Sequence, residues 1–379
     1  MKKVLVLVFS DLRHDARVNR QINWLRIKYQ VTAVCFESDP IAGVEIIKIR
    51  QAKLTAPRKA LLAAALTVRA FNIAFKLLHP YHDTLSELKQ RSFDFIFAND
   101  IDTLPLAFAM KNNAKVVFDA HEYAPRHFEN NKIWKTFFQP FYIHLCKKFI
   151  SKTDLMLTVG KGLAREYEVN FGVKPIIITN ATRFVDIAPS PVVANKIRLV
   201  HHGIANPSRR LELMVEMMKR LDDRFTLDLM LMTSDFASGK TRSYIEEFKQ
   251  RAASDPRIKI LPPVKSHDVV ETINRYDIGV FLLPPVNFNY ANALPNKLFD
   301  YIQARLGIAI GPSFEMAEIV REYQNGVVAK DFTAESLADA LRNLTSEDVV
   351  GFKERSEEAA KQVNADQNEK LLMERLAVL

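Results

Sequence analysis

The sequence predicts an α/β protein built from two domains, each with a parallel β-sheet. The first observation is a length of 379 residues, which exceeds one ordinary domain and suits two of average size. The second is that short apolar runs alternate with amphipathic helical patterns from end to end. The third is the proline-containing stretch 188–195, which lacks amphipathic period and which we interpret as the interdomain linker.

The first half begins with the apolar run Val4–Phe9, which Asp11 and Arg13 end too early for a signal peptide. We interpret this run as a buried parallel strand. The further strands expected in this half are Tyr29–Cys35, Phe93–Ala98, Lys115–Asp119, Leu155–Val159 and Pro175–Ile178. The helices expected between them are Ala16–Ile27, Arg58–Leu78, Thr103–Lys111 and Ile133–Ser151.

The second half repeats the alternation of strands and helices. Its expected strands are Ile197–His201, Thr226–Met232, Ile258–Leu261, Ile278–Leu283 and Ile308–Ile310. The end of the chain, from about Ser346, is helical and charged. We therefore predict a first domain over residues 1–187, a second over 196–352, and a C-terminal helical segment over 353–379.

Positive charge is concentrated in the first half. Residues 1–190 hold 28 Lys and Arg against 17 Asp and Glu, whereas the remaining 189 hold 25 and 27. This asymmetry favours an anionic partner for the first half. A nucleic-acid partner is not expected, because no known nucleic-acid-binding module is present. The two cysteines, Cys35 and Cys146, are far apart in sequence and predict a reducing compartment without a disulfide framework.

Two stretches of the first half contain basic residues and no acidic one. In residues 51–80 these are Lys53, Arg58, Lys59, Arg69 and Lys76; in residues 131–153 they are Lys132, Lys135, Lys147, Lys148 and Lys152, interleaved with Trp134, Phe137, Phe138, Phe141 and Tyr142. Cationic side chains beside exposed aromatic rings suit an anionic bilayer surface. The alternative is two ordinary helices with solvated faces. Arg69 and Lys76 exclude a membrane span in the first stretch.

The most informative segment is 291–311. Pro295 suits the first turn of a helix that would continue to about Arg305. Lys297 and Asp300 lie three positions apart and can share one helical face. A helix N-terminus with free N–H groups, a lysine and a carboxylate can hold a nucleotide diphosphate and its ribose. The alternative is a helix cap with a surface salt bridge.

Segment 291–311 resembles the donor site of GT-B glycosyltransferases, in particular the large retaining family 4. The resemblance implies two Rossmann-like domains facing a cleft, with the last helix crossing back to the first domain. It implies that Asp300 binds the ribose, that Asn292 lies at the donor sugar, and that Asn296, Lys297 and Leu298 belong to the donor site. Two residues depart from the family pattern: Asn292 replaces a glutamate, and Ile308 replaces a proline.

The segment that follows the linker, residues 199–213, predicts a second part of the donor site. A strand ends at Gly203, and a short loop then carries a proline and Arg209 into a helix. Such a turn forms a cationic pocket for phosphate, although a helix with exposed arginines is the alternative. In the resemblance, Gly203 and Arg209 match donor-binding positions and Ile204 replaces an arginine.

At the end of the strand 115–119, His121 and Glu122 fall at the carboxyl edge of the expected sheet, where open α/β sheets bind ligands. Residues 119–125 resemble the D-x-H-E-x-x-P run of family 4, which implies that His121 contacts the donor sugar and acceptor. Asp100 and Asp102 form a D-x-D pattern that could bind a divalent cation. Asp102 is also well placed to cap the next helix, and we expect no metal.

The first loop, residues 10–20, lacks the Gly-x-Gly-x-x-Gly pattern of dinucleotide-binding proteins, so NAD and FAD are not expected. It resembles the opening loop of part of the glycosyltransferase family. This resemblance implies that Arg13 and Arg17 contact acceptor or phosphate, with ordinary surface arginines as the alternative.

Together these motifs predict transfer of a sugar from a UDP- or GDP-linked donor to a lipid-linked or polysaccharide acceptor in cell-envelope glycan synthesis, with retention of configuration. No cofactor or metal is expected. The expected location is cytoplasmic, or peripheral on the inner face of the plasma membrane. The alternatives are a non-catalytic GT-B scaffold, which would explain Asn292 and Ile204, and a GT-B sugar-nucleotide epimerase.

Overall fold

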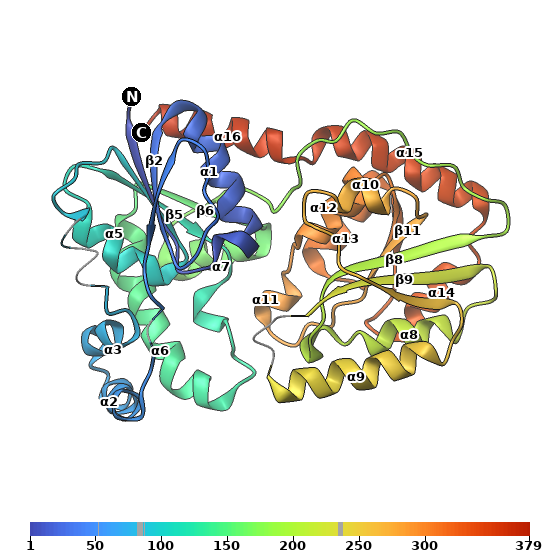
Figure 1. Cartoon of the computed structure of the whole chain (residues 1–379), viewed down its shortest axis with the longest axis horizontal. Coiled ribbons are helices and arrows are strands. Elements are labelled where there is room, and N and C mark those ends of the chain that lie inside the picture. Colours follow the sequence, from blue (N-terminus) through green and yellow to red (C-terminus); the bar gives the residue numbers. More distant parts are fainter. Residues whose placement is uncertain (52, 82–85, 87, 234–237) are drawn as a thin grey trace. The chain divides into compact units, whose positions relative to one another are not determined.

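The computed structural model describes residues 1–51, 53–81, 86, 88–233 and 238–379 (Figure 1). The chain divides into two compact units. The first comprises Met1–Ile178, Asn287–Asn289 and Leu371–Leu379, and the second comprises Thr179–Val286 and Tyr290–Lys370. Residues 179–195, which contain the linker expected at 188–195, run as coil and turn and belong to the second unit.

The first unit contains a seven-stranded parallel sheet in the order β3-β2-β1-β4-β5-β6-β7. Its strands are β1 (Lys3–Leu7), β2 (Gln30–Cys35), β3 (Val44–Lys48), β4 (Phe95–Asn99), β5 (Lys115–Ala120), β6 (Leu155–Thr158) and β7 (Ile176–Ile177). The sequence did not predict β3, an edge strand that is exposed or half-buried throughout and so carries no continuous apolar run. The other strands lie where apolar runs predicted them.

The helices of the first unit are α1 (Ala16–Lys28), α2 (Ala56–Thr67), α3 (Phe71–Leu78), α5 (Leu104–Met110), α6 (Lys132–Phe149) and α7 (Lys161–Phe171). The prediction of one helix over 58–78 was wrong, because α2 and α3 are separate. Arg69 adopts a left-handed backbone with φ of 57°, and the Ala70 N–H donates to the carbonyl of Ala65, which closes the end of α2.

The expectation of exposed aromatic rings on α6 was also wrong. Trp134 and Phe141 are buried, and Phe137, Phe138 and Tyr142 pack against the core of the first unit. The helix periodicity directs these rings inward and leaves the lysines outside. The large apolar side chains that are exposed on α2, α3, α6 and the α2–α3 turn are aliphatic: Leu61, Val68, Ile73 and Ile133.

The second unit contains a six-stranded parallel sheet in the order β10-β9-β8-β11-β12-β13. Its strands are β8 (Ile197–Ile204), β9 (Phe225–Met232), β10 (Ile258–Leu261), β11 (Ile278–Phe281), β12 (Gly307–Ile310) and β13 (Gly326–Val328). Its helices are α8 (Glu212–Met218), α9 (Gly239–Ala253), α10 (Val269–Ile273), α11 (Phe288–Ala291), α12 (Asn296–Gln303), α13 (Phe314–Tyr323), α14 (Ala334–Arg342), α15 (Ser346–Gln362) and α16 (Ala365–Ala377). Residues of α11 and α16 are shared between the two units.

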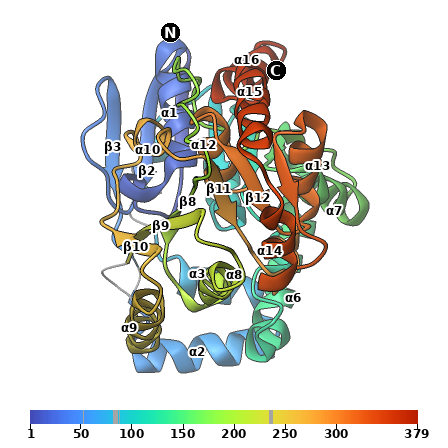
Figure 2. The same ribbon diagram turned by 90° about the vertical axis from the view of Figure 1, so that its right-hand side faces the viewer.

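Two apolar clusters hold the second sheet between layers of helices. One packs α8, α9 and α14 on one face, and the other packs α10, α12, α13 and α15 on the opposite face (Figures 1 and 2). Both faces are therefore buried, which explains why the strand signals are continuous apolar runs.

The end of the chain forms two helices where the sequence predicted one helical segment. A capping box between Thr345 and Asp348 starts α15, and Asn364 separates it from α16. Residues 371–379 of the chain, which include the last part of α16, belong to the first unit. In the part of the chain that the structure describes, no helix is long and apolar enough to cross a membrane.

Candidate functional site

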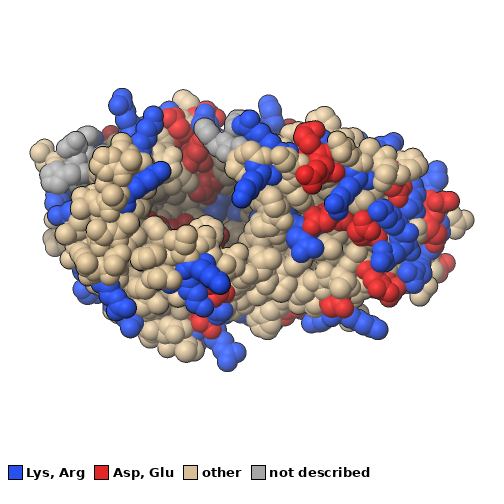
Figure 3. Space-filling view, turned by 90° about the horizontal axis from the view of Figure 1, so that it is seen from below, with Lys and Arg blue, Asp and Glu red and all other residues tan. Residues whose placement is uncertain are grey.

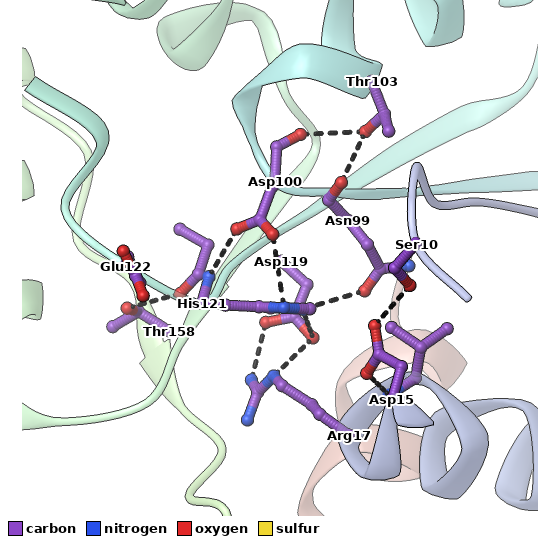
Figure 4. Close-up of polar contacts among 12 residues, drawn as sticks. Ser10, Asp15, Arg17, Asn99, Asp100, Thr103, Asp119, His121, Glu122 and Thr158 are labelled. Carbon is purple, nitrogen blue, oxygen red and sulfur yellow. Dashed lines mark hydrogen bonds and ion pairs between the residues drawn. The ribbon is translucent and has the colours of Figure 1, made fainter. Parts of the chain in front are cut away.

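A polar cluster lies at the carboxyl edge of the first sheet, where the strand order reverses between β1 and β4 (Figure 4). Ligands of open α/β sheets bind at such a switch point. Arg17 comes from α1, Asn99 ends β4, Asp119 lies on β5, and His121 follows it. Because parallel strands end at the same edge, residues separated by 102 positions meet here.

Arg17 and Asp119 form the buried centre of this cluster. The Arg17 guanidinium donates to both Asp119 oxygens, at 3.0 and 2.6 Å, and to the carbonyl of Ile178. Gln21 donates a further hydrogen bond to Asp119 at 3.0 Å. Burial alone would raise the pKa of Asp119, but Arg17 and His121 hold it well below its usual range. These hydrogen bonds direct the Arg17 guanidinium toward the core of the first unit, and the contact of Arg17 with acceptor or phosphate stays a prediction.

His121 lies between carboxylates. Its Nδ1 is 3.4 Å from Asp100 Oδ2, and its Nε2 is 3.7 Å from Asp119 Oδ2 and 3.2 Å from Asn99 Oδ1. Burial favours the neutral ring, but the two carboxylates outweigh it and raise the pKa of His121 to about 9. At neutral pH the ring is therefore an imidazolium, which can donate hydrogen bonds and cannot act as a general base.

Asp100 has a strained backbone. Its φ of 61° and ψ of 160° lie in a region that is essentially restricted to glycine. Asp100 N–H donates to the carbonyl of Asp119, and the Thr103 N–H and hydroxyl donate to the Asp100 carbonyl. This holds the carboxylate beside His121 with 48% of the side chain exposed. Such outliers occur at functional sites, where surrounding contacts enforce them.

The D-x-D pattern does not converge on one point. Asp100 faces His121, whereas Asp102 faces His79 Nε2 at 3.0 Å. Asp102 does not cap α5, whose N-cap is Thr103 with no side-chain hydrogen bond. Among the described residues, no group of three or more His, Cys, Asp or Glu is arranged to hold a metal ion.

Two other residues predicted from the sequence lie outside this cluster. Arg13 is exposed and pairs with Asp11 at 2.5 Å. Glu122 pairs with His127 Nε2 at 2.7 Å, and this contact raises the pKa of His127 against the effect of burial. The ring of His127 stacks on that of Phe128 with centroids 4.1 Å apart.

The second sheet has its own switch point, between β8 and β11. Gly203 belongs to the carboxyl end of β8, and α12 follows β11 in sequence and carries Lys297 and Asp300. Gly203 has a φ of 122°, and a Cβ there would lie 3.2 Å from Lys297 Nζ. The predicted donor residues Gly203 and Lys297 therefore lie in contact, although the sequence separates them by more than ninety positions.

Lys297 is 8% exposed and lies among uncharged groups. Its Nζ is 3.5 Å from His201 Nε2 and 4.0 Å from the centroid of the Phe281 ring. Burial, reinforced by the charge of Arg209 and opposed by that of Asp300, lowers the pKa of Lys297 well below its usual range. Burial and the nearby lysine likewise lower the pKa of His201.

Asp300 is held by two elements besides its own helix. The Thr182 hydroxyl donates to Asp300 Oδ1 at 2.5 Å, from the coil that follows the first sheet. His202 Nε2, on β8, lies 3.5 Å from Asp300 Oδ2. Burial first, and then the charge of Lys297, lowers the pKa of His202 to about 3, so the ring is neutral. The arrangement fixes a carboxylate that can accept hydrogen bonds from a diol.

Arg209 lies on a 3-10 turn, Pro207–Arg209, and not on the helix that the sequence predicted. Arg210 then takes a left-handed backbone with φ of 51°, and α8 begins only at Glu212. The Arg209 guanidinium lies 5.3 Å from the Tyr290 ring centroid, and the Ser208 hydroxyl is 2.7 Å from the Tyr290 hydroxyl. Ile204, which stands in place of an arginine, is 49% exposed.

The remaining predicted donor residues differ in exposure. Pro295 is the N-cap of α12, so Asn296 starts the helix half-buried, and Leu298 is buried in the apolar cluster beneath it. Asn292 is half-buried in the turn that precedes α12.

Sequence reasoning missed His201, His202 and Thr182 in these sites, and it missed the backbone conformation of Asp100. His201 and His202 lie in the segment that predicted Gly203, and paired histidines at a strand end were a usable signal. Thr182 and the strained backbone of Asp100 had no sequence signal, because they depend on contacts between distant segments.

Solved structures resemble the chain over its whole length. Anabaena HepE in complex with UDP and glucose gives a TM-score of 0.71 at 13% identity, with 100% of both chains covered. Sucrose-phosphate synthase from Thermosynechococcus elongatus gives 0.71 at 14% identity, covering 100% of this chain and 98% of that one. The chain has the GT-B fold. An α,α-trehalose-phosphate synthase (UDP-forming) from Burkholderia vietnamiensis gives 0.66 at 11% identity with 100% of both chains covered.

No protein-family profile matches the chain, and no curated protein sequence matches it. At identities of 11 to 14% the comparison defines the GT-B fold.

Proposed function

We propose that this GT-B protein is a glycosyltransferase that moves a sugar from a nucleotide diphosphate donor to a lipid-linked or glycan acceptor in cell-envelope glycan synthesis. The observation that carries the proposal is the convergence of Gly203, Lys297 and Asp300 at the switch point of the second sheet. Arg209 provides a second cation whose charge acts on Lys297. Two proteins that share the fold support it: Anabaena HepE was solved in complex with UDP and glucose, and the trehalose-phosphate synthase is UDP-forming.

In this proposal each group has a chemical role. Arg209 and Lys297 neutralise the departing diphosphate, where negative charge accumulates in the transition state. Asp300 accepts hydrogen bonds from the ribose hydroxyls. His121, as an imidazolium, supplies positive charge at the carboxyl edge of the first sheet. Asn292 hydrogen-bonds donor hydroxyls but cannot act as a base, so the leaving phosphate accepts the acceptor proton and configuration is retained.

Calorimetric titration with UDP, GDP, CMP and dTDP tests the nucleotide site. We expect one of the first two to bind below millimolar, and EDTA to leave the affinity unchanged because Arg209 and Lys297 supply the positive charge. Arg209→Ala is expected to weaken binding by about tenfold to a hundredfold, the loss of a charge-assisted hydrogen bond. Arg210→Ala is the matched control, since Arg210 is exposed and pairs with Glu212 at 2.6 Å.

The epimerase and scaffold alternatives give different products from a nucleotide sugar. A transferase releases nucleotide from UDP-glucose or GDP-mannose, slowly to water and faster to an acceptor, with the anomeric configuration of the product read by NMR. An epimerase converts the sugar without releasing nucleotide. A scaffold does neither. No nucleotide binding at millimolar concentration would reject the transferase.

We further propose that the first unit docks on an anionic membrane through the surface of α2, α3 and α6, on the cytoplasmic side. α2 packs against both α3 and α6. Exposed Leu61, Ile73 and Ile133 lie on these helices, and Lys59, Lys132, Lys135 and Lys147 are exposed on the same elements. Figure 3 shows Lys and Arg side chains among mostly uncharged ones in its left part, where acidic side chains are fewer than in its right part.

Vesicle sedimentation tests the membrane proposal. Each basic residue near an anionic leaflet contributes about 1 kcal/mol before screening, so the protein should pellet with anionic vesicles at low salt and be released at high salt. Changing Lys59, Lys132, Lys135 and Lys147 to Glu should abolish pelleting. Lys148 is left intact because it donates to Asn72. Equal pelleting with neutral vesicles would contradict the proposal.

A further inference from the structure

The side-chain nitrogen of Lys297 is enclosed by residues from other elements of the second unit. Nζ lies against the Phe281 ring on β11, His201 Nε2 on β8, and the backbone of Gly203. Among the residues that the structure describes, these contacts of Nζ are with a ring nitrogen, an aromatic face and a glycine, and none is an ion pair with a carboxylate. Burying a cation without an anionic partner is costly, and the usual response is loss of the proton.

His201 presents an acceptor to this lysine. Its Nδ1 lies 2.9 Å from the carbonyl oxygen of Val280, and a carbonyl can only accept a hydrogen bond. Nδ1 therefore carries the proton and donates, which leaves the lone pair of Nε2 directed at Lys297 Nζ. The Tyr301 hydroxyl donates to the same carbonyl at 3.2 Å, and the His201 and Phe281 rings stack with centroids 5.7 Å apart. The histidine is thus fixed as a neutral acceptor.

The other titratable groups around Lys297 come from three elements. His201 and His202 lie on β8, Arg209 lies on the 3-10 turn after it, and Asp300 lies on α12 itself. Arg209 opposes a positive charge on Lys297, and Asp300 favours it. Neither histidine adds positive charge near neutral pH, because burial is the largest effect on both rings and lowers their pKa values.

We propose that Lys297 takes up a proton when it binds the diphosphate of a nucleotide sugar, with His201 as the positioning residue that holds the amine at the phosphate. The inference rests on the proposed nucleotide site. The proton comes from solvent and bonds to the amine nitrogen, so the bound state holds an ammonium hydrogen-bonded to phosphate oxygen and to His201 Nε2. No covalent bond of the nucleotide changes. Binding of the donor is therefore linked to pH through the lysine.

The direction of the linkage follows from the two states. The anion raises the pKa of Lys297, so the free protein loses this proton at lower pH than the complex does. Proton uptake on binding should consequently grow as the pH rises, toward one proton for each ligand, and affinity should fall as it does so.

Calorimetry with UDP-glucose in two buffers of different protonation enthalpy measures this uptake directly. UDP-glucose is the probe because its diphosphate is esterified at both ends and does not titrate near neutral pH. Lys297→Met should lose about tenfold to a hundredfold in affinity and lose the uptake. Lys297→Arg, whose guanidinium stays charged, should bind without uptake. Lys249→Met, at an exposed lysine of α9, is the control that should match the unaltered protein.

The His201 variants separate positioning from a structural role. His201→Leu should weaken UDP-glucose binding more at about pH 9 than at pH 6, because the ammonium loses its acceptor. His201→Gln should restore the pH profile, since an amide can donate to Val280 and accept from Lys297. An equal loss at every pH would mean that His201 only supports the fold.

Failure of this inference and failure of the proposed function are distinguishable. Binding of UDP-glucose or GDP-mannose without proton uptake, or uptake that persists in Lys297→Met, would overturn the inference and leave the nucleotide site intact. Absence of binding by both nucleotide sugars at millimolar concentration would overturn the proposed function.

Discussion

The switch points of the two sheets both hold histidines that are buried or half-buried, but in opposite protonation states. In the first unit, His121 lies within 3.7 Å of two carboxylates, which raise its pKa to about 9. In the second unit, His202 faces Asp300 at 3.5 Å, yet burial and Lys297 lower its pKa to about 3. The pKa of His201, which lies beside Lys297, is lowered as well.

The difference shows that burial disfavours the charged form of a histidine, and that the charges of its neighbours decide whether the ring is protonated. His121 has Asp100 and Asp119 on two sides, and Arg17 keeps Asp119 ionised. Of the two histidines at the second switch point, His202 contacts a carboxylate, that of Asp300, and Lys297 and Arg209 add basic groups nearby. The first edge is therefore a completed network of charges, whereas the second has an excess of basic groups that suits a dianionic ligand.

Removing Arg17 should have the largest effect on this comparison. Arg17→Met leaves the buried Asp119 carboxylate without its bidentate partner and should destabilise the first unit by about 3–5 kcal/mol. Urea denaturation followed by tryptophan fluorescence measures this selectively, because both tryptophans, Trp24 and Trp134, lie in the first unit. Arg13→Met, at an exposed arginine, should change little. Equal stability of the two variants would show that Asp119 is satisfied without Arg17.

Titration of the histidines tests the comparison directly. His121 should titrate near pH 9 and contribute roughly 3 kcal/mol to the stability of the first unit. Its folded pKa is raised, so this contribution is complete below the unfolded value of about 6.5 and is lost as pH rises toward 9. His202 should stay neutral above pH 5. NMR of labelled histidines, assigned with His121→Gln and His202→Gln, gives the pKa values of both residues. Equal pKa values would contradict the difference between the two units.

Two substitutions of Asp100 separate the cost of its backbone strain from the effect of its charge. Asp100→Gly removes a backbone cost of about 1–3 kcal/mol but also loses the contacts with His121, so the unfolding free energy should change by no more than about 1 kcal/mol. Asp100→Asn keeps the strain and loses the charge, so it should be the less stable of the two and should lower the pKa of His121. The same denaturation and NMR measurements report both. If the glycine variant is less stable than the asparagine variant, the backbone of Asp100 does not carry the proposed strain.

The smallest expected effect concerns the support of Asp300. Thr182→Val removes the 2.5 Å hydrogen bond to Asp300 Oδ1 while keeping the volume of the side chain. We expect a loss of about 1 kcal/mol, or roughly fivefold, in affinity for UDP or GDP. Thr182→Ser should restore it. Calorimetry that finds the valine variant unchanged would show that Asp300 is positioned without Thr182.

The sequence predicted those parts of the molecule whose signal is local. Apolar runs bounded by charges located the buried strands of both sheets, because parallel strands covered on both faces carry continuous apolar segments. The edge strand Val44–Lys48 and the break at Arg69 were missed, since a half-exposed edge and a left-handed residue have weak local signatures. The three-residue spacing of Lys297 and Asp300 on a helix start was a local feature as well, and it located the candidate nucleotide site.

Tertiary structure decided what each charged residue can do. Two arginines of one loop, Arg13 and Arg17, look equivalent in sequence, yet one is exposed and the other is buried against Asp119. Two histidine positions at strand ends likewise differ in protonation because distant segments bring carboxylates to His121 and a lysine to His201. Residue type and spacing define which groups are present, whereas burial and partners from remote parts of the chain set their charge, because a charge out of water depends on its nearest neighbours.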